Sequence, residues 1–155
     1  MDLVTKALAV AQEAHRGQRD KLGKPYIYHP IRVAHSLQHY DEELQAAGLL
    51  HDVLEDTELT VEDLHLMEFP VGVISLVEIL TKDENYTYKD YVRNIGYVKE
   101  AIIIKIADVM DNYSRPLRPL PEESKGLQER YEWSIKFLTN KLYGKEGDHD
   151  DLSDV

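Results

Sequence analysis

The sequence contains no cysteine, which excludes disulfide bonds, thiolate metal ligands and cysteine nucleophiles. It also has no run of eighteen apolar residues, and its start lacks the basic and apolar pattern of a signal peptide. Positive charge is scarce as well, because 18 Lys and Arg face 29 Asp and Glu for a formal charge of -11. We therefore expect a cytoplasmic protein that binds neither a membrane nor a nucleic-acid polymer.

The 155 residues, 43% of them hydrophobic, are enough for one hydrophobic core but too few for two domains that each bury a sizeable core. We predict a single folded domain over residues 1–144. Residues 145–155 are acidic and nearly free of apolar side chains, which is typical of a disordered tail. No feature of the sequence indicates an oligomeric state.

Apolar residues recur at helical spacing along most of the chain. The pattern predicts helices over about 2–16, 30–37, 41–55, 60–69, 71–80, 86–95, 99–112 and 121–143. Asp41 and Thr60 are predicted caps. The segment 99–112 carries four isoleucines and could equally be a buried strand, but nothing else in the sequence offers it a strand partner. We therefore predict an all-α fold, a single helical bundle.

The helix around residues 49–56 has two unlike faces. Leucines and valine fill one arc, whereas His51, Asp52, Glu55 and Asp56 lie within about 140 degrees of one another on the other. Such a face can bind a metal ion and transfer protons, but a charged face is as often simply solvated. The pattern by itself leaves both interpretations open.

Two further residues favour a metal site. Asp108 lies in IIIKIADVM, where apolar residues surround it, and a buried carboxylate must be paired or bind a metal. Its alternative role is an ion pair with Lys105, one turn away. His29 follows a loop at the start of a helix, where its alternative role is packing or capping. Two imidazoles and two carboxylates would suit Mn²⁺, Fe²⁺ or Zn²⁺.

The loop before His29, HRGQRDKLGK, is basic in an acidic protein. Arg16, Arg19, Lys21 and Lys24 face a single acidic residue, Asp20. Arginine and lysine bind phosphate groups, so we expect this loop to recognise an anionic small molecule. The alternative is an exposed basic loop without a ligand.

The order His29, His51-Asp52, Asp108 resembles the H…HD…D pattern of the HD superfamily of phosphohydrolases. The stretches GKPYIYHP, AAGLLHDVLEDTELT, ILTK and IKIADVMDN further resemble the hydrolase domain of RelA/SpoT proteins and the small alarmone hydrolases. This resemblance covers roughly residues 1–143 and implies a single HD-domain helical bundle.

The resemblance also implies roles for individual residues. It makes His29, His51, Asp52 and Asp108 the ligands of Mn²⁺ or another divalent transition metal. It assigns Glu55 and Asp56 to the hydrolytic water, and Arg19, Lys21 and Asn112 to the substrate. The implied reaction is hydrolysis of the 3′-diphosphate of ppGpp or pppGpp to GDP or GTP and pyrophosphate. The alternatives are another phosphorylated nucleotide as substrate, or a non-catalytic nucleotide or metal sensor.

One position departs from the resemblance. Many family members carry Arg-Lys where this sequence has Asp20-Lys21, and that arginine is thought to contact the purine. Asp20 offers no planar cation for stacking, although Arg19 can supply one. The resemblance therefore supports the reaction class more strongly than it supports guanine as the base.

Overall fold

Every regular element is an α-helix in the computed structural model, which describes residues 1–115 and 123–144. In these two ranges the only β pairing is an isolated bridge between Arg19 and Pro25. The helices are α1 (Leu3–Ala14), α2 (Tyr28–Ser36), α3 (Glu42–Leu50), α4 (Val53–Asp56), α5 (Val61–Leu66), α6 (Val71–Ile79), α7 (Tyr88–Ile95), α8 (Lys99–Ser114) and α9 (Glu123–Tyr143). The predicted all-α class is confirmed. The tail predicted over 145–155 lies outside the described residues.

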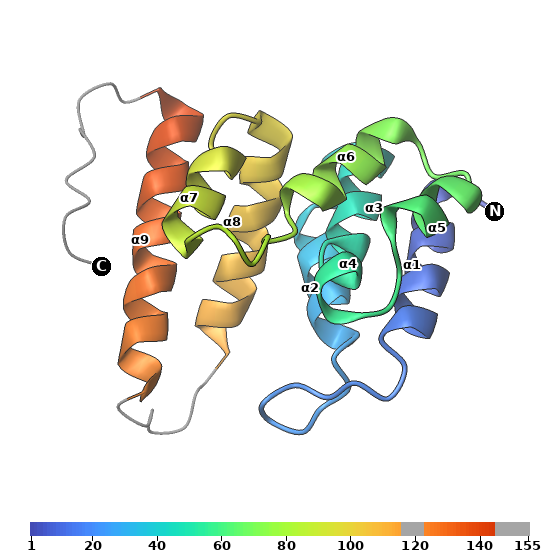
Figure 1. Ribbon diagram of the computed structural model, residues 1–155, viewed down its shortest axis with the longest axis horizontal. Helices are drawn as coiled ribbons and strands as arrows, with labels where there is room; N and C mark the ends of the chain where they lie inside the picture. The colour runs from blue at the N-terminus through green and yellow to red at the C-terminus, as the bar shows by residue number, and fades with distance from the viewer. Residues whose placement is uncertain (116–122, 145–155) are drawn as a thin grey trace.

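The helices form two groups that meet along α2 and α8 (Figure 1). In the first group, α1, α2 and α6 pack around α3. In the second, α9 packs along α8, with α7 beside them. Since α8 also contacts α2 and α3, the two groups share one interface. No helix within 1–115 or 123–144 combines the length and apolar character that a membrane span requires.

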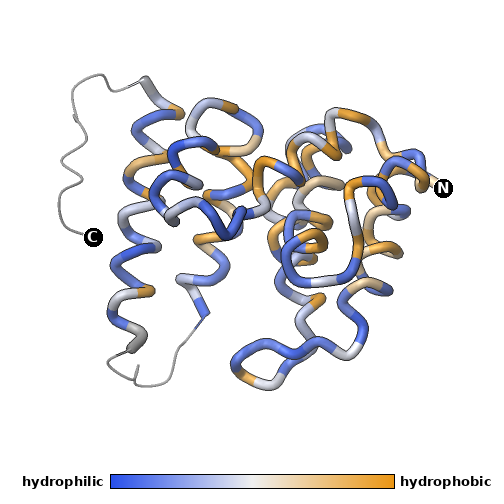
Figure 2. Tube along the Cα trace, in the orientation of Figure 1, coloured by the Kyte–Doolittle hydropathy of each residue, from blue (hydrophilic) through white to orange (hydrophobic). Residues whose placement is uncertain are grey.

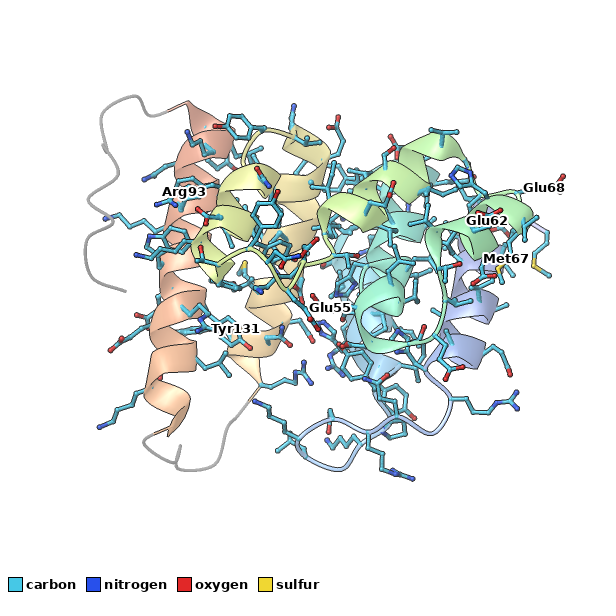
Figure 3. All side chains as sticks on the ribbon, viewed as in Figure 1. Glu55, Glu62, Met67, Glu68, Arg93 and Tyr131 are labelled. Carbon is cyan, nitrogen blue, oxygen red and sulfur yellow. The ribbon has the colours of Figure 1, made fainter. Side chains whose placement is uncertain are left out.

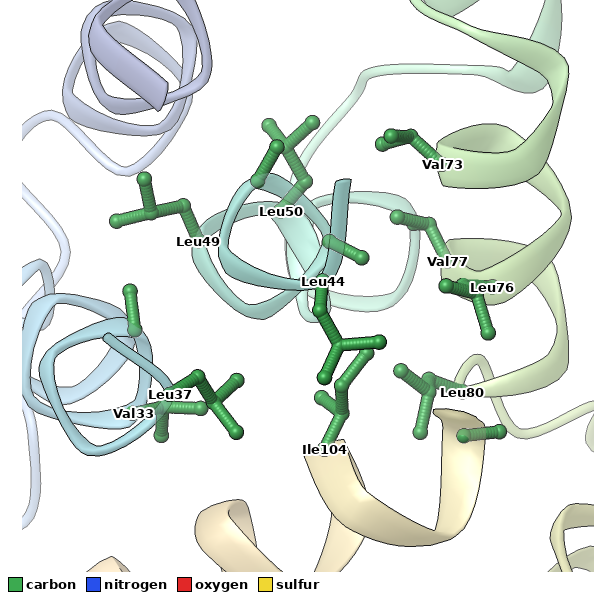
Figure 4. Close-up of a cluster of buried hydrophobic side chains, with 14 of the residues drawn as sticks. Val33, Leu37, Leu44, Leu49, Leu50, Val73, Leu76, Val77, Leu80 and Ile104 are labelled. Atoms are coloured by element: carbon green, nitrogen blue, oxygen red, sulfur yellow. The ribbon is translucent and has the colours of Figure 1, made fainter. Parts of the chain in front are cut away.

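The core surrounds α3. Leu44 and Leu50 of this helix are buried, as are Val77 of α6 and Ile104 of α8, and Figure 4 shows Leu44 beside Ile104. Hydrophobic and hydrophilic residues alternate along the helices, whereas the loop between α1 and α2 is mostly hydrophilic (Figure 2). Burial of these side chains stabilises the fold by roughly 1.5–3 kcal/mol each before entropy is subtracted.

Two predicted helix caps are present. The Asp41 carboxylate accepts a hydrogen bond from the backbone N–H of Leu44 at the start of α3. Thr60 and Asp63 form a reciprocal capping box at the start of α5. Each cap satisfies backbone donors that the first helical turn leaves without partners. These short polar residues therefore set where the two helices begin.

The segment that could have been a strand is helix α8. Its buried residues Ala101, Ile104 and Asp108 recur at intervals of three and four, which places them on one face of a helix. This face packs against α2 and α3. The β-branched isoleucines are accommodated because burial outweighs their small helical disadvantage.

The prediction of a single helix over 41–55 is wrong. The chain forms α3 up to Leu50, turns at His51 and Asp52, and resumes as α4 at Val53. The Nδ1–H of His51 donates to the carbonyl oxygen of Gly48 at 2.6 Å. That carbonyl is the one that the amide of Asp52 would use in a continuous α-helix. The side chain of His51 thus competes with the helix at this point.

Candidate active site

The four side chains predicted to bind a metal meet where three segments join. His29 lies in the first turn of α2, His51 and Asp52 form the turn between α3 and α4, and Asp108 lies in α8. The Nε2 atom of His29 is 2.9 Å from Oδ1 of Asp108 and 3.7 Å from Oδ2 of Asp52. The Nε2 atom of His51 is 2.9 Å from Oδ2 of Asp52 and 3.5 Å from Oδ1 of Asp108. These four residues are called the HD cluster below.

Both imidazoles turn Nε2 toward the carboxylates. The carbonyl oxygen of Gly48 can only accept a hydrogen bond, so Nδ1 of His51 must carry a proton. Nδ1 of His29 is 2.7 Å from Oδ2 of Asp111, and an ionised carboxylate likewise only accepts. In the neutral form of each ring, Nε2 therefore presents a lone pair to the interior of the HD cluster.

The two carboxylates of the HD cluster favour a positive charge beside them. Burial opposes the charged form of His51, yet the carboxylates of Asp52 and Asp108 hold its pKa well above the usual value. Burial alone would raise the pKa of Asp108, but Lys105 and the two imidazoles hold it well below the usual range. Nζ of Lys105 is 2.7 Å from Oδ2 of Asp108. The ion pair considered as an alternative for Asp108 is thus present together with the histidine contacts.

The donor atoms fit a divalent cation. His29, His51 and Asp108 are all buried and form a group whose ligand atoms lie within 4.8 Å of one another. Nε2 of His51 is buried and makes no well-formed hydrogen bond within the described chain, although Oδ2 of Asp52 lies 2.9 Å away. A buried polar atom without a partner is costly, and a cation between the lone pairs and the carboxylates would remove that cost. Imidazole nitrogen and carboxylate oxygen are suitable ligands for Mn²⁺, Fe²⁺ and Zn²⁺.

Glu55 and Asp56 lie on the short helix α4, directly after the HD cluster. Glu55 and Asp56 remain exposed at the surface, but partial burial raises the pKa of both carboxyls, and the nearby charge of Asp52 raises them further. Oε1 of Glu55 accepts a hydrogen bond from the backbone N–H of Lys82 at 3.0 Å. Glu55 lies near the middle of the molecule in Figure 3, on the side of α4 toward α8. Carboxyls with raised pKa values are suited to proton transfer.

A cavity of about 250 Å³ adjoins the HD cluster. Two residues that line this cavity also bond to the HD cluster. The Tyr26 hydroxyl donates to Oδ2 of Asp52, and Nδ2 of Asn112 donates to Oδ1 of Asp108 at 3.1 Å. The cavity also brings together the predicted substrate residues. It is lined by Gln18, Arg19, Asp20, Lys21, Leu22, Tyr26, Asn112, Arg115, Leu127 and Tyr131, the last of which Figure 3 labels on α9.

The sequence patterns do not single out Asp111 and Arg32, which adjoin His29. The Nε of Arg32 donates to Oδ1 of Asp111 at 2.7 Å, and its Nη2 donates to Oδ2 at 3.1 Å. Hydrogen bonds from His29 and Arg32 outweigh burial and lower the pKa of Asp111 to about 2. Helical spacing could have indicated both residues, since Arg32 follows His29 by three positions and Asp111 follows Asp108 by three.

Comparison with known families identifies a conserved type of domain. The family model described as HD domain matches residues 7–94, which is more than half of the chain. The match includes His29, His51 and Asp52 and ends before Asp108. The first three members of the HD cluster therefore lie in the region that the family model describes.

Individual relatives extend the match. A guanosine-3′,5′-bis(diphosphate) 3′-pyrophosphohydrolase, MESH1, of Danio rerio is 36% identical over 141 residues, covering 83% of this chain and 78% of that protein. A probable enzyme of the same name from Synechocystis is 32% identical over 154 residues, covering 90% of this chain and 20% of that protein. One from Borreliella burgdorferi is 36% identical over 127 residues, covering 70% and 18%. The chain thus spans about a fifth of these two bacterial relatives.

A solved structure shares the fold. It is the subject of work titled "A metazoan ortholog of SpoT hydrolyzes ppGpp and plays a role in starvation responses". Its TM-score with this chain is 0.74 at 28% sequence identity, and the alignment covers 93% of this chain and 87% of that one. Together with the family model and the MESH1 match, this similarity shows that the chain belongs to the HD domain family, among the relatives of SpoT and MESH1.

Proposed function

We propose that this protein hydrolyses the 3′-diphosphate of ppGpp or pppGpp to GDP or GTP and pyrophosphate, using Mn²⁺ or another divalent transition metal. The observation that carries the proposal is the position of the HD cluster beside a cavity lined by cations. Tyr26 and Asn112 each belong to both, since they line the cavity and bond to cluster carboxylates. The names of MESH1 and of the SpoT ortholog support the choice of substrate.

His29, His51, Asp52 and Asp108 would hold the metal. A divalent ion bound there would polarise a phosphoryl oxygen and lower the pKa of a bound water. Lys105 engages Oδ2 of Asp108, which leaves Oδ1 on the side of the imidazoles. The protein thereby holds the side chains that would bind the metal in fixed orientations.

Glu55 and Asp56 orient the attacking water and accept its proton. In the reaction, the water oxygen forms a bond to the phosphorus attached to the 3′ oxygen, and the bond between that phosphorus and the 3′ oxygen breaks. The 3′ oxygen gains a proton and pyrophosphate leaves. The raised pKa values of both carboxyls bring them closer to the pH at which proton transfer is most effective.

The cavity binds the rest of the nucleotide. Arg19 supplies a planar cation for the base or for a phosphate, and Lys21 supplies a mobile point charge for phosphate. Both side chains are exposed on the loop between α1 and α2, so an incoming ligand can reach them. Asn112 connects this region to Asp108.

A second candidate substrate is a 3′-phosphorylated nucleotide with another base. The observation that favours it is Asp20, whose carboxylate lines the cavity where many family members carry an arginine. Loss of that arginine removes a contact to the purine. The reaction and the metal would be the same, and only the preference among bases would differ.

The test is hydrolysis by the purified protein loaded with Mn²⁺. The substrates are ppGpp, its adenosine counterpart and adenosine 3′,5′-bisphosphate, with products separated by anion-exchange chromatography. We expect GDP and pyrophosphate in equal amounts from ppGpp, and none with Asp52→Asn. A higher kcat/KM for an adenine nucleotide would favour the second candidate. Metal binding without hydrolysis of any of the three would overturn the enzymatic proposal in favour of a sensor.

A further inference from the structure

We infer that Asp111 and Arg32 are positioning residues that fix the ring of His29, so that its Nε2 lone pair faces the metal. The inference rests on the proposed metal site and concerns two residues that the reaction itself does not use. Both belong to the interface between α2 and α8, one helical turn beyond the HD cluster.

The two helices meet in two layers. In the inner layer, His29 of α2 contacts Asp108 of α8 at 2.9 Å. In the outer layer, Arg32 of α2 forms a forked ion pair with Asp111 of α8, at 2.7 and 3.1 Å. The bond between Nδ1 of His29 and Oδ2 of Asp111, at 2.7 Å, joins the layers. The ring of His29 is thus held from both sides.

In the neutral ring that can bind a metal through Nε2, the outer layer determines which ring nitrogen carries the proton. Asp111 accepts bonds from Arg32 and lies 3.7 Å from Nε of Arg115, so its oxygens act as acceptors and Nδ1 of His29 must donate. A carboxylate behind a ligating histidine also increases the basicity of the ligand. His51 obtains the same orientation from a backbone carbonyl. Only His29 therefore depends on a side chain that a substitution can change.

The substitution Asp111→Asn would reverse this arrangement. The new amide has one accepting and one donating end, and the fork of Arg32 demands acceptors at both. Where Nε of Arg32, 2.7 Å from Oδ1 in the wild type, retains the amide oxygen, the NH₂ group turns toward Nδ1 of His29. The ring must then accept at Nδ1 and carry its proton on Nε2, where the metal binds. Removing Arg32 as well would free the amide to turn over again.

The experiment measures Mn²⁺ affinity by the electron paramagnetic resonance signal of the free ion, without substrate. The variants are Asp111→Asn, Arg32→Leu and the double variant. The matched control is Asp90→Asn, which breaks the i,i+3 pair with Arg93 on α7. We expect Asp111→Asn to weaken binding about 10- to 100-fold, the control to be unchanged, and the double variant to bind more tightly than Asp111→Asn.

Tighter Mn²⁺ binding by the double variant than by Asp111→Asn distinguishes positioning from a structural role. If Asp111 and Arg32 only stabilised the fold, removing both would weaken Mn²⁺ binding further. Long-range ¹H–¹⁵N spectra of the Zn²⁺-loaded protein give a second readout, in which Nδ1 of His29 is protonated in the wild type. Mn²⁺ affinity of Asp111→Asn within twofold of wild type would overturn the inference and leave the proposed function intact. A double variant weaker than Asp111→Asn would also overturn it. A wild-type protein that binds none of Mn²⁺, Fe²⁺ and Zn²⁺ would overturn both.

Discussion

Asp20 and Arg115 form an ion pair, with Oδ2 of Asp20 3.4 Å from Nη1 of Arg115, and both line the cavity beside the HD cluster. The other oxygen of Asp20 accepts hydrogen bonds from the backbone N–H groups of Leu22 and Lys24, each at 2.9 Å. Asp20 therefore shapes the basic loop and neutralises a cation of the cavity at the same time.

Asp20→Asn separates these two roles. The amide oxygen can still accept from the loop, but the negative charge that faces Arg115 is lost. We expect KM for ppGpp to fall about two- to fivefold at unchanged kcat, because an anionic ligand meets less repulsion and a freer guanidinium. Asp20→Arg, which introduces the commoner family residue, should instead raise KM, since it removes the loop acceptor and places two cations together. Steady-state kinetics of both variants measure KM for ppGpp. A lower KM in Asp20→Arg than in Asp20→Asn would contradict these roles of Asp20.

Arg19 and Lys21 should differ in what they recognise. Nη1 of Arg19 donates to the carbonyl of Gly23 at 2.8 Å, which holds the guanidinium within the loop. We expect Arg19→Ala to raise KM and to weaken discrimination between purine bases, whereas Lys21→Ala raises KM for all phosphorylated substrates alike. Arg16→Ala is the control, because Arg16 pairs with Glu13 and does not line this cavity. If both variants stay within about twofold of wild type, roughly 0.4 kcal/mol, the loop is not the recognition element.

Removal of a cluster ligand should remove the metal. We expect His51→Ala and Asp52→Ala to lose bound Mn²⁺ in metal analysis after gel filtration, because each leaves fewer than four donors. His39→Ala, at an exposed histidine, should retain wild-type occupancy. Unchanged occupancy in the two cluster variants would refute the ligand assignment.

Glu55→Gln and Asp56→Asn should keep the metal and lose activity. Each substitution preserves shape but removes a proton acceptor, and such losses typically lower turnover about 100-fold or more. Glu58→Gln, two positions beyond Asp56 and exposed, is the matched control. Wild-type turnover in both Glu55→Gln and Asp56→Asn would remove these residues from the mechanism.

Glu55 should also make stability depend on pH. Burial and the charges of Asp52 and Asp56 raise its pKa above the ordinary 4.5, so the folded protein binds this proton more tightly than the unfolded chain does. The resulting destabilisation is present above the folded pKa and disappears as the pH falls through it toward 4.5. Glu55→Gln should therefore be slightly more stable than wild type at pH 7 in the metal-free protein. Urea unfolding at pH 7 and pH 4.5 measures this, and a less stable variant at pH 7 would contradict it.

Much of the fold could be predicted because local chemistry and packing agree. Asp41 and Thr60 mark helix starts through their own side chains, and the buried positions of α8 have helical spacing. The break at His51 was not predictable, since it depends on a side chain competing for the carbonyl of Gly48. Helical periodicity contains no information about such competition.

The candidate site was predicted less completely than the fold. Sequence patterns indicated residues that resemble known motifs, including His29 and Asp108, and the structure brings these together. Asp111 and Arg32 carry no motif; helical spacing places each of them one turn from a cluster residue, but their bonds to each other and to His29 depend on the packing of α2 against α8. The roles of the HD cluster residues as metal ligands, and of Asp111 and Arg32 as positioning residues, stay predictions.

The distance along the chain between His29 and Asp108, 79 residues, has a consequence for biosynthesis. Chains emerge from the ribosome N-terminus first, so His29, His51 and Asp52 are released well before α8 can dock against α2. A nascent chain holds at most three of the four candidate ligands until that moment. Stable loading with metal would then have to wait until α8 has been synthesised and has docked against α2, and a fragment limited to residues 7–94 would lack the residue that closes the cluster.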